Sequence, residues 1–95
     1  MDTGSKAIAT DPADRGVIID FPQAKPVLQS EEHWVWKLNK DSFSRNGLPP
    51  IGTVVYVLPT HICPTSALYP GVVVIRNGKQ VDYWEVGARD RKITI

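Results

Sequence analysis

The sequence lacks the features that mark several specialised classes of protein. It has a single cysteine in 95 residues, so it cannot form an internal disulfide, whereas a small secreted domain usually has several. No apolar run approaches the roughly 18–20 residues that cross a bilayer. The first residues also contain no apolar region typical of a signal peptide. We therefore expect a cytoplasmic protein without a membrane partner.

An excess of charge of one sign is also absent. Eleven lysines and arginines and ten acidic residues are interspersed and give a net charge of +1. Such a balance provides no basic surface for the phosphates of a nucleic acid or of an anionic membrane. The chain has neither a glycine-rich phosphate loop nor the Gly-x-Ser-x-Gly motif of a hydrolase nucleophile. We expect no nucleic-acid partner.

The sequence is marked by proline, glycine and short apolar runs. Eight prolines and seven glycines are typical of a loop-rich β protein, and we find no convincing amphipathic helix. Six or seven strands are expected, in residues 17–20, 24–29, 33–38, 53–58, 72–76, 79–86 and 91–95. The predicted fold is all-β, a small antiparallel β-barrel or sandwich. Residues 1–16 are predicted to be a loop-rich lead-in, and residues 17–95 to form the β-domain.

Two local patterns refine this prediction. Strict alternation over residues 33–38 would place Trp34, Trp36 and Leu38 on one face of a strand. Asn77-Gly78 supplies two residues that readily adopt the left-handed backbone of a type I′ turn, which predicts a hairpin around it. We expect the tryptophans to lie in the core or in a subunit interface.

His61-x-Cys63 is the sharpest candidate for chemistry. In an extended backbone, residues two apart point to one side with Cα atoms roughly 6.6 Å apart, so the imidazole and the thiolate can share one ion. A thiolate ligand favours zinc over magnesium, calcium or manganese, and the flanking Pro59 and Pro64 would stiffen the loop. Two ligands do not complete a structural zinc site. The pair is therefore either an open catalytic site, or a buried Cys63 beside a His61 bonded to backbone.

His33 is a second candidate, because Glu31 and Glu32 precede it. A neighbouring carboxylate can fix the tautomer of an active-site histidine. The alternative is a histidine at the end of a strand with two solvated acids beside it.

Four segments then occur in an ordered series. They are Asp2-Thr3-Gly4-Ser5-Lys6-Ala7; Ser30-Glu31-Glu32-His33; Pro59-Thr60-His61-Ile62-Cys63-Pro64-Thr65; and Val74-Ile75-Arg76-Asn77-Gly78 with Asp82, Trp84 and Ala88-Arg89. They resemble, in the same order, segments of the C-terminal region of the D-serine dehydratase and D-threonine aldolase family. The members of this family are pyridoxal-phosphate enzymes with an alanine-racemase-like architecture. The resemblance spans nearly the whole chain.

The resemblance implies a metal site and a reaction. In the dehydratases the His-x-Cys pair binds zinc, so His61 and Cys63 are the implied metal ligands. The aldolases tend to have His-x-Asp and a manganese-type ion, so Cys63 favours the dehydratase. The metal would bind the β-hydroxyl of a D-amino acid and stabilise it as it leaves, which converts D-serine to pyruvate and ammonia. In the aldolase alternative, the metal holds the hydroxyl while the Cα–Cβ bond breaks.

The resemblance also implies parts that this chain does not contain. Pyridoxal phosphate would be bound by a barrel domain preceding Asp2, in a full-length enzyme that forms a homodimer. Lys6 follows that barrel and is not the cofactor lysine. We expect the chain, as a fragment or a truncated gene product, to be inactive alone, and we identify no catalytic residue in it. A non-catalytic β-domain fragment is the alternative; a standalone zinc protein would need more ligands.

Overall fold

The computed structural model describes residues 1–38, 49–90 and 92–94. Its elements in this part of the chain are β1 (Gly16–Ile18), β2 (Lys25–Gln29), β3 (Trp34–Lys37), β4 (Val57–Pro59), α1 (Ile62–Ser66), β5 (Gly71–Arg76), β6 (Lys79–Glu85) and the 3-10 turn η2 (Gly87–Arg89). The strands pair antiparallel as β1–β4, β2–β3 and β5–β6. The all-β class is confirmed, but these described strands form three two-stranded sheets and not a closed barrel.

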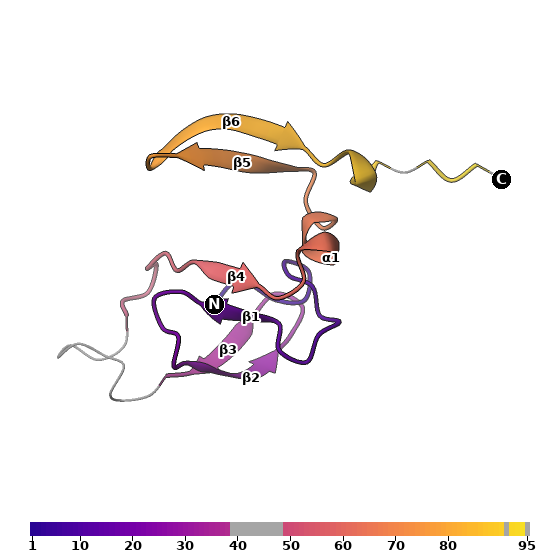
Figure 1. Cartoon of the computed structure of the whole chain (residues 1–95). Helices are drawn as coiled ribbons and strands as arrows, with labels where there is room; N and C mark the ends of the chain where they lie inside the picture. Colours follow the sequence, from indigo (N-terminus) through magenta and orange to yellow (C-terminus); the bar gives the residue numbers. More distant parts are fainter. Residues whose placement is uncertain (39–48, 91, 95) are drawn as a thin grey trace.

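The predicted hairpin is confirmed in β5 and β6. Arg76 pairs with Lys79 across Asn77 and Gly78, whose φ angles are 51° and 74°. Positive φ at both central residues defines the predicted type of turn. Figure 1 shows the hairpin apart from the other strands, with α1 between them.

The alternation in β3 is also confirmed. Trp34 is buried, Trp36 is half-buried and Val35 is exposed. The two indole rings lie 4.6 Å apart between centroids and tilt by 60°. In the partner strand β2 the register shifts between Pro26 and Leu28. A bulge at this point accommodates Pro26, because a proline within a sheet is confined to an edge strand or a bulge.

The strand expected at residues 53–58 is shorter and lies later than predicted. β4 begins only at Val57 and includes Pro59, which lies beyond the predicted range. The length of its partner explains the difference, because β1 has only three residues and Pro59 pairs with Gly16. A proline is tolerated in β4 because one of the strand's sides has no ladder to which an N–H must donate.

The core lies in the part of the molecule that contains β1 to β4. The buried hydrophobic residues are Ile8, Ala9, Ile18, Ala24 and Trp34. Two of them belong to the N-terminal segment, residues 1–16, so this segment packs into the core although it has almost no regular structure. The hairpin contributes none of the five.

Two predictions fall partly outside the described residues. The β-domain predicted for residues 17–95 includes residues 39–48, and the last strand expected at residues 91–95 includes Arg91 and Ile95, all of which lie outside them. Residues 92–94 have no regular structure. Within the described ranges, none of the helices has the length and apolar character that crossing a bilayer requires.

Candidate functional site

The His61-x-Cys63 pair lies at the start of a helix, and the extended loop predicted for it is wrong. His61 is the N-cap of α1, with φ −123° and ψ 100°, whereas Cys63 already lies in the first helical turn. Pro64 is tolerated there because the first N–H groups of a helix have no partner within the helix. The spacing argument for an extended backbone therefore does not apply, since the two ligand candidates leave backbones of different conformation.

Thr65 attaches this loop to the N-terminal segment. Its buried hydroxyl donates to the carbonyl oxygen of His61 at 2.8 Å and accepts from the backbone N–H of Ala9 at 2.9 Å. One hydroxyl can donate one hydrogen bond and accept others, so the contact uses both capacities. Thr65 thereby links the backbone of His61 to Ala9, which lies 56 positions before Thr65 in the sequence.

Two more hydrogen bonds join the same two parts of the chain. The N–H of Thr60 donates to the carbonyl oxygen of Arg15 at 3.1 Å. Beyond α1, the hydroxyl of Tyr69 donates to the carbonyl oxygen of Ala7 at 2.7 Å. Residues 7–15 therefore lie beside residues 60–69, and hydrogen bonds join the two segments both before and after His61. The motif of residues 59–65 is called the His61 loop below.

Asp11 is the residue near this site that the sequence analysis missed. Its Oδ2 lies 2.6 Å from Nδ1 of His61. Both side chains are about half exposed. No local signal could have identified the contact, because 50 positions separate the two residues. The pairing of β1 with β4, together with the hydrogen bonds of Ala9 to Thr65 and of Thr60 to Arg15, brings the carboxylate to the imidazole.

The donor atoms available here suit zinc in an open site. An imidazole nitrogen and a thiolate are ligands that zinc accepts, and Cys63 is a free, exposed cysteine. Among the residues that the structure describes, no group of three histidine, cysteine or acidic side chains could hold a metal ion. By the chemistry of its two donor atoms, the pair would suit an open site, in which water or substrate fills the other positions of the ion, and not a closed structural site, which needs four ligands.

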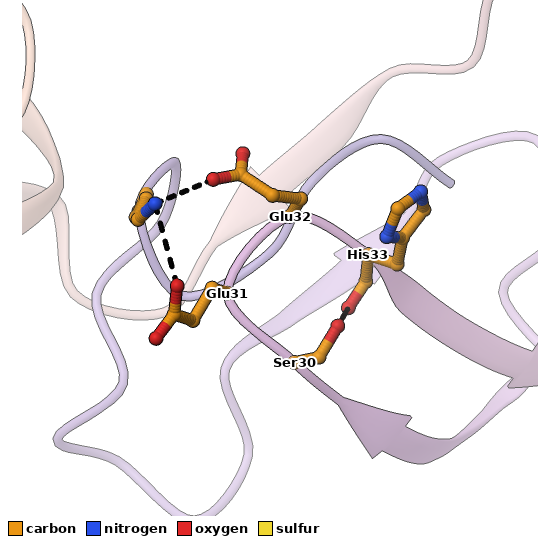
Figure 2. Close-up of polar contacts among 5 residues, drawn as sticks. Ser30, Glu31, Glu32 and His33 are labelled. Atoms are coloured by element: carbon orange, nitrogen blue, oxygen red, sulfur yellow. Dashed lines mark hydrogen bonds and ion pairs between the residues drawn. The ribbon is translucent and has the colours of Figure 1, made fainter.

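A second polar cluster, formed by Lys6, Glu31 and Glu32, joins the segment 2–7 to the segment 30–33 (Figure 2). The Lys6 ammonium lies 2.6 Å from Oε1 of Glu32 and 3.4 Å from Oε2 of Glu31. The hydrogen bond to Glu32 raises the pKa of Lys6, and the same bond lowers the pKa of Glu32. The imidazole of His33 points away from these carboxylates. Its carbonyl oxygen accepts hydrogen bonds from the Ser30 N–H at 2.9 Å and from the Ser30 hydroxyl at 3.4 Å. The carboxylate partner expected for His33 is found instead at His61.

Backbone contacts hold this cluster together. The N–H groups of Ser5 and Lys6 donate to the carbonyl oxygens of Ser30 and Glu31 at 2.9 and 3.2 Å. A Cβ on Gly4 would overlap the Glu31 carbonyl group. Glycine is therefore needed at this position for close approach of two backbones and not for an unusual φ.

Comparisons with known proteins bear on the whole chain. Residues 1–75 match the model of a family described as "Putative serine dehydratase domain". Uncharacterized proteins of Mycobacterium tuberculosis and Mycobacterium bovis are each 36% identical over 95 residues, which cover 96% of this chain and 68% of the relative. A D-threonine aldolase of an Arthrobacter species is 44% identical over 41 residues, 43% of this chain and 11% of the aldolase.

These likenesses agree with the order of motifs along the chain. The family match includes the N-terminal segment, both polar clusters and the His61 loop, and it ends inside β5. The resemblance inferred from the four segments is thereby confirmed at the level of the family. With 75 of its 95 residues matched, this chain belongs to the serine dehydratase domain family.

Proposed function

We propose that this chain is the metal-binding C-terminal domain of a zinc- and pyridoxal-phosphate-dependent D-amino acid lyase of the D-serine dehydratase type. The observation that carries the proposal is the His61-x-Cys63 pair, which lies within the family match and at the start of α1, where Thr65 bonds the backbone of His61. D-Serine, giving pyruvate and ammonia, is the proposed substrate. A barrel domain binding pyridoxal phosphate, and a second copy of the full-length enzyme, are the proposed partners.

The proposed role of His61 and Cys63 is to hold zinc with open positions facing the substrate. Zinc bound there would act as a Lewis acid on the substrate's hydroxyl group. Thr65 fixes the backbone of His61, and α1 fixes that of Cys63, so each ligand leaves an ordered backbone. Both side chains are exposed, which leaves the pair accessible to a substrate carried by another domain.

The cofactor would contribute the electron sink that makes the α-proton of the amino acid acidic. Nothing in this chain is assigned to hold it. The cluster of Lys6 with Glu31 and Glu32 is exposed, and the ammonium already has two carboxylate partners. Lys6 therefore has a structural role here as a link between two motifs.

A D-threonine aldolase-like domain is the second candidate, because one relative with that name is 44% identical over part of the chain. The two proposals differ in the bond broken beside the substrate's hydroxyl group. Cys63 favours the dehydratase, since a thiolate prefers zinc to manganese.

Metal binding can be tested directly on the chain. We expect the purified protein to bind one Zn²⁺, and Co²⁺ in its place to show thiolate-to-cobalt charge-transfer absorption. Because Cys63 supplies the thiolate, Cys63→Ala should lose that absorption and the zinc, while Ser66→Ala, a substitution in the same helix, should keep both. Zinc retained by Cys63→Ala would contradict the assignment.

The reaction can be tested in a chimera. This chain would replace the C-terminal segment of a D-serine dehydratase or a D-threonine aldolase that retains its own barrel. We expect pyruvate from D-serine with the unchanged chain and none with Cys63→Ala, at equal pyridoxal-phosphate absorbance. Glycine and acetaldehyde from D-threonine, without pyruvate from D-serine, would favour the aldolase.

A further inference from the structure

We infer that Asp11 is a positioning residue for the metal site: its carboxylate holds the His61 imidazole with the proton on Nδ1 and leaves Nε2 as the metal ligand. The inference rests on the proposed zinc-binding function of His61. It is carried by the 2.6 Å contact between Asp11 Oδ2 and His61 Nδ1.

The tautomer follows from the chemistry of the two groups. A carboxylate only accepts hydrogen bonds, so Nδ1 must be the donor in this contact. A neutral imidazole has one N–H, and its other nitrogen then has a free lone pair. A metal ion needs that lone pair, which in this arrangement is on Nε2. Carboxylates or carbonyl groups bonded to the second nitrogen commonly orient histidine ligands in this way.

Hydrogen bonds anchor the chain both before and after Asp11. Ala9 is anchored by Thr65, and Arg15 is anchored by Thr60. Both anchors lie within the same motif as His61, so the carboxylate and the imidazole are positioned from a common segment. Since both side chains are about half exposed, the pair contributes more to the orientation of the ring than to the stability of the fold.

The first test compares zinc affinities in the full chain by competition with a chromophoric chelator. Removal of an orienting partner typically weakens metal binding about 10–100-fold, so we expect a loss of this size for Asp11→Ala. Asp11→Asn keeps an acceptor oxygen and should lose less. Asp14→Ala removes the same charge from an exposed position three residues away, and we expect no loss.

The second test reads the tautomer without metal. In a ¹⁵N–¹H NMR spectrum at a pH where the imidazole is neutral, His61 should have its proton on Nδ1. Asp11→Ala should shift the population towards the Nε2–H form, and His33 should not change in the same spectrum. A substitution that only destabilised the fold would not change the ratio of the Nδ1–H and Nε2–H tautomers of His61. The measurement therefore separates positioning of the ring from folding.

The outcomes separate this inference from the function on which it rests. If the unchanged chain binds no zinc, the proposed function fails, and the NMR spectrum still decides whether Asp11 sets the tautomer. If zinc binds through Cys63 but Asp11→Ala matches Asp14→Ala in affinity and tautomer, the inference is overturned and the proposed function stands. Complete loss of zinc in both Asp11→Ala and Asp11→Asn would also overturn it, because Asp11 would then be a ligand.

Discussion

Thr65 is the one buried polar residue in the described part of the chain. Its two hydrogen bonds join it to His61 and to Ala9, which lies in the segment that carries Asp11. Its hydroxyl satisfies a carbonyl of the His61 loop and an N–H of the segment that carries Asp11. A buried polar group costs free energy when its partner is removed. The residue therefore couples the stability of the fold to the geometry of the site.

Replacement of Thr65 by valine tests this coupling. Thr65→Val has nearly the same shape but leaves the Ala9 N–H and the His61 carbonyl without this partner. We expect the free energy of unfolding to fall by about 1–3 kcal/mol, measured by urea denaturation. Thr65→Ser keeps the hydroxyl and should lose less. A larger loss in Thr65→Ser than in Thr65→Val would contradict this explanation, because the methyl group that valine retains would then contribute more than the two hydrogen bonds.

At the residue scale, the sequence indicates candidate side chains but does not predict which of them contact one another. The candidates His61 and Cys63 stay a prediction. Glu31 and Glu32 adjoin His33 in sequence, yet both carboxylates bind Lys6. His61 has no acidic neighbour in its own motif, yet Asp11 contacts it. Contacts between residues 26 or 50 positions apart depend on how segments pack, and a single sequence has no record of that.

At the scale of elements, the predictable parts are those built from local backbone preference. The Asn77-Gly78 turn carries its conformation in two adjacent residues, and the alternation in β3 needs only one strand. α1 was missed because five residues are too few to show a helical period, and because its anchor to the rest of the domain is the bond from the Ala9 N–H to the Thr65 hydroxyl, 56 positions away. Pro64 does not break the helix, since the N–H that it lacks would have no partner within the helix in any case.

The turn also offers a test at this scale. Gly78 has φ +74° with open space around a Cβ, so Gly78→Val costs backbone strain alone. We expect the hairpin to lose about 1 kcal/mol or more, seen as at least about fivefold faster amide hydrogen exchange in β5 and β6. Gly87 also faces open space but has no positive φ. Gly87→Val should leave exchange in the hairpin unchanged, and similar effects of the two variants would refute the explanation.

At the scale of the whole molecule, much apolar surface faces solvent. The exposed large side chains of the hairpin are Val72, Val73, Ile75, Val81, Tyr83 and Trp84. None of the described side chains falls below 2% exposure, so the core is small. Exposure of this many large apolar side chains in one hairpin is typical of an interface with another domain or chain. It agrees with the proposal that the domain packs on a barrel in a full-length enzyme.

We therefore expect the isolated chain to self-associate. Sedimentation velocity over increasing concentration should show dimers or larger species, because association would cover the exposed face of the hairpin. Val72 pairs with Trp84 and Val73 with Tyr83 on opposite faces. Replacing one pair by threonines and then the other should identify the face, as only one change should restore a monomer. A stable monomer with a high melting temperature would contradict this prediction.

The long reach of the contacts around His61 has a consequence for the order of events during folding. The hairpin closes over two residues, a step that takes about 1–10 μs in isolated hairpins. The bonds of Ala9 and Asp11 to the His61 loop span 56 and 50 positions, so they require closure of a large loop, whose entropic cost must be met first. During synthesis the N-terminal segment leaves the ribosome well before its partner exists. The imidazole therefore acquires its carboxylate late, after the local elements have formed.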